Sequence, residues 1–211
     1  MEILTLELGP FATNAFLLWN DGGNEAVLFD APPGAEDTLP NVLSERGLEL
    51  TDVYLTHGHW DHFSGLPQLE STSLETWLHP EDRILVEKPE LAASYVPPGL
   101  PMRPARIDHD LHHGQKLEIL GQTCEVRHVP GHCPGNVLFY FKQQNFAITG
   151  DAIFAGSIGR TDLPGGDFPT LEKAIREQIY TLPDSTRLLP GHGPQTSVAQ
   201  EKGSNPFVRP T

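Results

Sequence analysis

Side chains that could bind metal gather in a short stretch in the first third of the chain. Three histidines and a carboxylate lie within six residues, directly after an apolar run at residues 53–55, and they are His57, His59, Asp61 and His62. Imidazole nitrogens and carboxylate oxygens together suit zinc, iron or manganese. The pattern predicts a compact set of metal ligands placed where a strand ends and a helix begins.

Three further candidate ligands follow downstream, and they are His132, Asp151 and His192. Each comes directly after a glycine and an apolar or β-rich segment, as a loop residue at the end of a strand does. The whole set is too large for one tetrahedral ion and suits two. A purely structural zinc site is disfavoured, because such sites draw mostly on cysteine thiolates.

The elements that must position these residues alternate between strands and helices. Turn signals and β-branched or aromatic runs predict strands at 2–8, 13–20, 25–30, 52–57, 75–79, 116–121, 123–129, 136–142, 146–150 and 186–190. Apolar periodicity predicts helices at 35–46, 61–70, 81–87, 169–181 and 196–203. Strands in runs with interspersed helices favour a sheet-rich layered fold over a purely parallel βαβ array.

Residues 88–115 form a proline-rich stretch in which we expect irregular backbone, because proline supports neither a helix interior nor a central strand. Such a long connection is either a surface excursion or a flap beside the metal site. Both interpretations remain open from the sequence.

Composition limits the class of protein. The chain has 211 residues, enough for one domain with a sizeable core. Its net charge of −14 disfavours a nucleic-acid partner. The pattern of residues predicts neither a signal peptide nor a membrane span. The two cysteines, Cys124 and Cys133, suit a reducing compartment, so we expect a cytoplasmic protein.

The ligand pattern resembles that of the metallo-β-lactamase-fold superfamily, and its single-domain glyoxalase II-like (hydroxyacylglutathione hydrolase-like) branch in particular. Residues 9–14, the pair Phe29-Asp30 and the run at 159–167 extend the resemblance over nearly the whole chain. It implies an α+β fold, an αββα four-layer sandwich of two mixed β-sheets flanked by helices. It also implies one domain over residues 1–211, without the C-terminal helical domain that binds glutathione in glyoxalase II enzymes.

The resemblance further implies a role for each ligand. His57, His59 and His132 would hold one ion, Asp61, His62 and His192 the second, and Asp151 would bridge them. We expect two divalent transition-metal ions, Zn²⁺ first, with iron or manganese as alternatives. A water shared by the ions would lose its proton near neutral pH and become the nucleophile, oriented by Asp61.

Thioester hydrolysis is the reaction that the sequence favours, on a hydroxyacylglutathione-type substrate or a related ester. A thiolate leaves readily, so a general acid is not required. Arg160 matches a basic residue that contacts the glutathione carboxylate in the family, although an ion pair with Asp162 or Asp167 is an equally good role. The tyrosines that help to hold glutathione have no counterpart here, so the partner is predicted only as an anionic small molecule.

Two alternatives stay open. A mononuclear-iron persulfide dioxygenase would use the equivalents of His57, His132 and Asp151. A non-catalytic metal-binding interaction module is the third interpretation. Lactamases of the best-known zinc type carry cysteine at the position of Asp151, which disfavours that activity.

Overall fold

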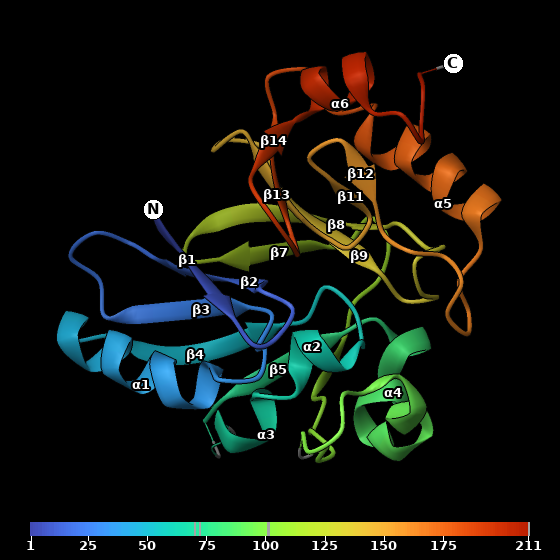
Figure 1. The fold of residues 1–211 in the computed structure, drawn as a ribbon. Helices are drawn as coiled ribbons and strands as arrows, with labels where there is room; N and C mark the ends of the chain where they lie inside the picture. Colours follow the sequence, from blue (N-terminus) through green and yellow to red (C-terminus); the bar gives the residue numbers. More distant parts are fainter. Residues whose placement is uncertain (70, 72, 101, 211) are drawn as a thin grey trace. The chain divides into compact units, whose positions relative to one another are not determined.

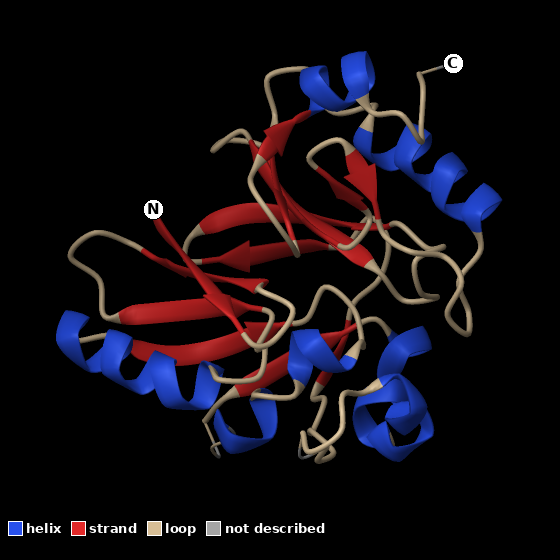
Figure 2. Ribbon diagram, in the orientation of Figure 1, coloured by secondary structure: helices blue, strands red, loops and turns tan. Residues whose placement is uncertain are grey.

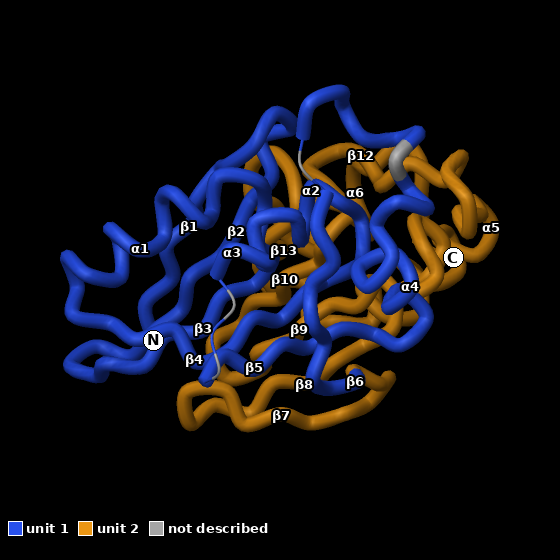
Figure 3. Tube along the Cα trace, turned by 90° about the horizontal axis from the view of Figure 1, so that it is seen from below, with its two compact units in different colours: residues 1–110 blue, residues 111–211 orange. Residues whose placement is uncertain are grey.

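The computed structural model describes residues 1–211 apart from 70, 72, 101 and 211. The chain forms two compact units, unit 1 over residues 1–110 and unit 2 over residues 111–211, distinguished by colour in Figure 3. Each unit has its own mixed sheet and its own helices. The prediction of a single domain stays a prediction.

Unit 1 is organised around a six-stranded sheet in the order β1-β2-β3-β4-β5-β6 (Figure 1). Strands β1 to β3 pair antiparallel, and β3 to β6 pair parallel. Its elements are β1 (Glu2–Leu8), β2 (Thr13–Trp19), β3 (Glu25–Phe29), α1 (Ala35–Arg46), β4 (Glu49–Tyr54), α2 (Trp60–Phe63), α3 (Leu66–Leu69), β5 (Glu75–Leu78), the 3₁₀ turn η1 (Pro80–Asp82), α4 (Arg83–Glu87), the 3₁₀ segment η2 (Pro89–Tyr95) and β6 (His109–Asp110).

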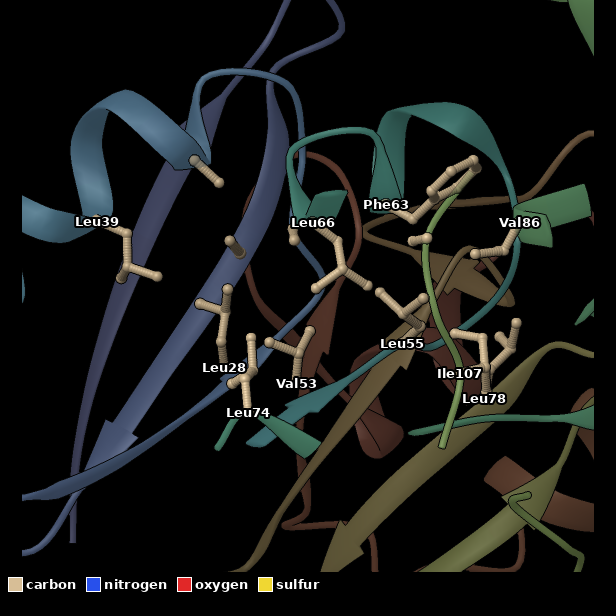
Figure 4. Packing of buried hydrophobic residues seen from close by; sticks show 14 of the residues in the cluster. Leu28, Leu39, Val53, Leu55, Phe63, Leu66, Leu74, Leu78, Val86 and Ile107 are labelled. Carbon is tan, nitrogen blue, oxygen red and sulfur yellow. The ribbon is translucent and has the colours of Figure 1, made fainter. Parts of the chain in front are cut away.

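The core of unit 1 is a leucine-rich layer between the sheet and its helices (Figure 4). Leu28 and Val53 project from neighbouring strands, while Leu39 comes from α1 and Leu66 from α3. All four are fully buried or nearly so, and burial of each such side chain contributes about 1.5–3 kcal/mol. This layer fixes the ends of β3 and β4, where the first candidate ligands begin.

Unit 2 contains a second six-stranded mixed sheet in the order β14-β13-β10-β9-β8-β7, with α5 and α6 beside it in Figure 2. Leu138 and Leu188 of the sheet belong to one apolar cluster with residues of the continuous helix formed by α5 and η3, namely Leu171, Ile175 and Ile179. The elements are β7 (Lys116–Ile119), β8 (Gln122–His128), β9 (Val137–Phe141), β10 (Phe146–Gly150), β11 (Ile153–Phe154), β12 (Ser157–Ile158), α5 (Phe168–Ala174), the π-helical turn η3 (Ile175–Ile179), β13 (Arg187–Pro190), β14 (Thr196–Ser197) and α6 (Val198–Ser204).

Most predicted elements lie where the sequence placed them, and three differences have clear physical causes. The strand predicted at 52–57 is wrong by three residues at each end, since β4 begins at Glu49, opposite Glu25, and ends at Tyr54. The helix predicted at 61–70 is interrupted at Gly65, where a side chain would strike the carbonyl of Pro32. The short strands β6, β11, β12 and β14 carry too few residues to show an alternation.

The proline-rich stretch is more regular than predicted. It contains the 3₁₀ segment η2 and, near its end, strand β6, which pairs with β5. A flap role for this stretch stays a prediction. None of the helices in the described part of the chain has the length and apolar composition needed to cross a membrane.

Candidate metal centre

The first group of candidate ligands follows directly from the parallel pairing of β3 and β4. Phe29 pairs with Tyr54, so both strands end at the same edge of the sheet, and Asp30 lies beside the loop that carries His57. The Asp30 backbone is left-handed, with φ of 62°, and its N–H donates to the Tyr54 carbonyl at 3.0 Å. The fully buried Asp30 carboxylate accepts the N–H of Thr56 at 2.7 Å and its hydroxyl at 2.8 Å.

The hydrogen bonds around Asp30 assign the tautomers of two histidines. His62 Nδ1 lies 2.8 Å from Asp30 Oδ2, so the ring proton is on Nδ1. The Thr56 hydroxyl gives its hydrogen to Asp30 and therefore accepts the Nδ1–H of His57 at 3.0 Å. In both rings Nε2 carries the lone pair. A carboxylate or hydroxyl that fixes Nδ1–H is the usual support of a histidine that ligates metal through Nε2.

Unit 1 brings all four of its predicted ligands together. His57 Nε2 lies 3.1 Å from His59 Nδ1, and the centres of the His57 and His62 rings are 4.1 Å apart. Asp61 Oδ2 lies 3.8 Å from His62 Nε2 and also accepts a hydrogen bond of 3.3 Å from the hydroxyl of Thr13. Two atoms each about 2.0–2.1 Å from one tetrahedral ion are about 3.3 Å apart, so the His57–His59 spacing suits ligation.

A second buried carboxylate supports the backbone of the same loop. Asp82 is fully buried, and its Oδ2 accepts the N–H of Gly58 at 2.9 Å, between two predicted ligands. A Cβ at position 58 would come within 3.1 Å of both Asp82 and Leu85. The start of α4 is thus packed directly on the loop.

The predicted ligands of unit 2 come from three strand ends. Strands β10 and β13 run parallel, and the Gly191 N–H donates to the Gly150 carbonyl at 2.9 Å just before His192 and Asp151. Asp151 Oδ2 lies 3.6 Å from His132 Nε2 and 3.4 Å from His192 Nε2. These distances exceed an ordinary hydrogen bond and match the spacing of ligand atoms around an ion. Unit 2 therefore brings its three candidates together.

A main-chain carbonyl fixes the tautomer of His132. Its Nδ1 lies 2.7 Å from the Arg160 carbonyl oxygen, which can only accept, so Nδ1 carries the proton and Nε2 the lone pair. The close approach depends on Gly159, where any Cβ would overlap the Asp151 carbonyl oxygen and lie 2.9 Å from His132 Nδ1. Imidazole nitrogens with carboxylate neighbours, as in both units, form donor sets suited to divalent metal ions.

The side chain of Arg160 forms the ion pair that the sequence offered as its structural role. Its Nε and Nη2 donate to the two carboxylate oxygens of Asp162 at 2.7 and 2.8 Å. These hydrogen bonds raise the pKa of Arg160 and lower the pKa of the Asp162 carboxyl to about 2. Both side chains are well exposed, at 60% and 69%, so the pair contributes little to stability.

Sequence reasoning missed the residues that support the ligands. Asp30 was noted only as the end of a strand, Thr13 only as part of a matching segment, and Thr56 and Asp82 had no assigned role. One signal was available, because Asp30 is a charged residue directly after an apolar strand and before another apolar pair. His109, which is outside the predicted ligand set, contacts Glu75 with its Nε2 at 2.6 Å.

Known proteins and a family model match most of the length of this chain. The family model described as the metallo-beta-lactamase superfamily matches residues 8–192. Hydroxyacylglutathione hydrolase GloC of Haemophilus influenzae is 38% identical over 214 residues, which cover 99% of this chain and 98% of that protein. The probable metallo-hydrolase YqgX of Bacillus subtilis is 35% identical over 209 residues, with the same two coverages of 99% and 98%.

Solved structures also match this chain over nearly its whole length. BLEG-1, a B3 metallo-beta-lactamase, has a TM-score of 0.90 and 38% identity, covering 98% of this chain and 99% of that one. TTHA1623 in a di-iron-bound form has a TM-score of 0.84 and 36% identity, covering 97% and 100%. ETHE1 from Myxococcus xanthus has a TM-score of 0.81 and 25% identity, covering 99% and 84%. These likenesses confirm the predicted fold, with its mixed sheets and flanking helices.

Proposed function

The chain belongs to the metallo-β-lactamase superfamily, and we propose that within it the chain is a dinuclear metal-dependent thioester hydrolase. Membership of this superfamily supports the coarser statement that the chain is a metal-binding hydrolase. The finer proposal adds a substrate class, a thioester of the hydroxyacylglutathione type or a related ester. It also assigns all the candidate ligands to one metal centre, and these ligands are His57, His59, Asp61, His62, His132, Asp151 and His192.

One observation carries the proposal: three of the five candidate histidines, drawn from both units, are held through Nδ1, so that Nε2 is their donor atom. Asp30 and Thr56 do this for His62 and His57, and the Arg160 carbonyl does it for His132. A packed core histidine needs no such consistent orientation. The same arrangement is the support expected around catalytic metal ions.

In the proposed centre His57, His59 and His132 would hold one ion, Asp61, His62 and His192 would hold the other, and Asp151 would serve both. Such ions, Zn²⁺ first with iron or manganese as alternatives, would supply Lewis acidity and lower the pKa of bound water toward neutrality. Asp61 would orient the water that attacks the substrate. Thr13 donates to Asp61 Oδ2 at 3.3 Å, which supports the orientation of this carboxylate.

A thioester suits this set of groups. Its thiolate leaving group needs little protonation, and the described ligands provide no obvious dedicated acid. The relative GloC, named a hydroxyacylglutathione hydrolase, supports the same substrate class. We assign Arg160 to the anionic end of the substrate. Asp162 occupies its Nε and Nη2, so a substrate carboxylate would contact Nη1 or replace Asp162.

A second candidate is persulfide oxidation by one iron. His57, His132 and Asp151 would form a facial set of two histidines and one carboxylate, which is typical of non-haem iron. The neighbour TTHA1623 is described in a di-iron-bound form, so iron is a realistic metal for this fold. A metal-binding interaction module without turnover is the third candidate.

The deciding experiment is elemental analysis of the purified protein combined with turnover on a thioester, an ester, a β-lactam and a persulfide. We expect two transition-metal ions per chain and the highest turnover on the thioester. The lactam is included because BLEG-1 is described as a lactamase. One iron with oxygen uptake on the persulfide would replace this proposal with the second candidate, and metal without turnover would favour the third.

The variant Asp61→Ala tests the role of the second ion. We expect it to keep much of the ion held by His57, His59 and His132 but to lose hydrolysis by about 100-fold or more, since an orienting and ligating group is gone. Metal content and kcat are measured on the same sample. Full activity in Asp61→Ala would rule out the two-ion mechanism.

A further inference from the structure

A buried carboxylate on the last helix is not explained by the metal ligands themselves. Glu201 of α6 is fully buried. Its Oε1 accepts the hydroxyl of Thr196 at 2.5 Å, and its Oε2 accepts the N–H of Gly156 at 3.0 Å and the amide of Asn205 at 2.8 Å. Burying a carboxylate is costly unless donors converge on it, and here both oxygens have them.

The donors show what Glu201 holds. Gly156 is in the turn of the β11–β12 hairpin, with a left-handed φ of 72°. Asn205, which donates to Glu201, also donates to the Ser157 carbonyl at 3.0 Å. The hairpin pairs only Ile153 with Ile158 and Phe154 with Ser157, too short a ladder to be stable alone. Glu201 and Asn205 therefore anchor its turn to the rest of unit 2.

The hairpin and the two residues that follow it contact all three candidate ligands of unit 2. Asp151 lies two residues before its first strand, and Gly159 directly follows its second strand and packs against the Asp151 carbonyl and the His132 ring. The next carbonyl, that of Arg160, accepts the Nδ1–H of His132 at 2.7 Å.

The remaining ligand is contacted by the hairpin's first strand. The Phe154 ring meets the His192 ring edge to face, with centres 5.8 Å apart and planes at 76°. A shift of the hairpin would therefore disturb the orientation of His132 and the packing of His192 together. The hairpin thus helps to hold these ligand side chains in position.

We propose that Glu201 is a positioning residue of the metal centre: it holds the β11–β12 hairpin and, through it, the orientation of His132, Asp151 and His192. The inference rests on the proposed function, since it assumes that these side chains bind metal. Glu201 itself touches none of the three. Its effect is expected on how metal is held, and on catalysis only through that.

The variant Glu201→Gln tests the proposal with cobalt(II) as the probe. Glutamine keeps the shape, but its amide nitrogen cannot accept, so at least one of the three donors loses its acceptor. We expect cobalt affinity to fall by about 10–100-fold, the effect typical of residues that orient ligands, and the visible absorption of bound cobalt to change.

Ser197→Ala is the matched control. Ser197 caps the same helix by accepting the Gln200 N–H at 3.2 Å and makes none of the hairpin contacts of Glu201. It should lower the melting temperature by about 2–4 °C. Cobalt affinity and absorption should remain those of the wild type.

The outcomes separate a positioning role from a structural one. If Glu201→Gln binds cobalt with wild-type affinity and absorption and merely melts earlier, like Ser197→Ala, the proposal is overturned. If Glu201→Gln does not fold, Thr196→Val, which removes one hydrogen bond to Oε1, is compared with Ser197→Ala by the same criteria.

The test also distinguishes this inference from the proposed function. A wild-type chain that binds cobalt but hydrolyses no thioester contradicts the proposed activity, while the cobalt comparison still decides the role of Glu201. A wild-type chain that binds no cobalt contradicts both.

Discussion

The two units assemble their candidate ligands in different ways. Unit 1 takes four from the loop and short helix after β4, all within one stretch of six residues. Unit 2 takes three from separate strand ends and relies on the register of β10 and β13 to bring Asp151 and His192 together. A dense motif is visible in a sequence, whereas a set gathered by sheet topology shows itself only when the pairing is known.

The supports of the ligands differ as well. In unit 1 the carboxylate of Asp30 fixes His62 directly and His57 through Thr56. In unit 2 a main-chain carbonyl fixes His132, and the hairpin beside it depends on Glu201. A side-chain support can be removed by one substitution, but a main-chain support can be disturbed only by moving the backbone.

The largest effect is expected from Asp151→Ala, because Asp151 lies beside both histidines of its unit and is assigned to both ions. Loss of several kcal/mol of charge stabilisation corresponds to about 1,000-fold in kcat/KM. Metal content should fall in parallel. Asp184→Ala removes an exposed carboxylate paired with Lys202 and is the control for charge alone. If both variants keep their metal and activity, unit 2 does not contribute the bridge.

An intermediate effect is expected from Asp30→Ala, which tests the side-chain support of unit 1. Metal affinity should fall by about 10–100-fold because His57 and His62 lose their fixed tautomers. The free energy of unfolding should fall by about 3 kcal/mol, since buried donors lose their acceptor. Isothermal titration and denaturant unfolding measure the two effects.

Asp52→Asn is the matched control for Asp30→Ala, since Asp52 is a β4 carboxylate that bonds Trp77 and Thr51 away from the ligands. It should lose stability and keep its metal affinity. Equal metal affinity in Asp30→Ala and the wild type would show that unit 1 needs no such support.

The smallest effect concerns the exposed pair of Arg160 and Asp162. Its hydrogen bonds lower the pKa of Asp162 from 3.8 to about 2. A lowered pKa in the folded protein means that the pair stabilises above about pH 4 and is lost as the pH falls toward 2. In Arg160→Ala the Asp162 pKa should return to its ordinary value, measured by NMR titration. KM for an anionic thioester should rise more than kcat falls; an unchanged KM would leave Arg160 with its structural role.

The sequence was sufficient to predict the elements that carry a strong pattern. Helix α1 and strands β1 and β10 occupy the predicted residues, because their apolar positions and turn signals agree. The superfamily followed from the ligand order and type. The boundaries of β4 and the existence of the short hairpin β11–β12 could not be predicted in this way, because strand pairing rather than local composition decides them.

The supporting residues could not be predicted for a different reason. Asp30 acts on His62 across 32 positions and Glu201 acts on Gly156 across 45, and no local pattern links such pairs. Burial turns an ordinary acidic residue into a support, and burial is a property of the folded chain. The residues that support the predicted ligands could therefore be identified only from the folded structure.

The π-helical turn Ile175–Ile179 accommodates one extra residue in the helix that holds the C-terminal segment. Its wider turn closes with the Tyr180 N–H on the Ile175 carbonyl, and the Tyr180 hydroxyl then donates to the carbonyls of Glu201 and Val208 at 3.2 and 2.9 Å. Because a π turn spans one residue more than an α turn, deleting one residue there would restore a regular α-helix and leave Tyr180 on the same face of it. A one-codon deletion in this turn should therefore be tolerated by the tail of the chain as well as by every predicted ligand.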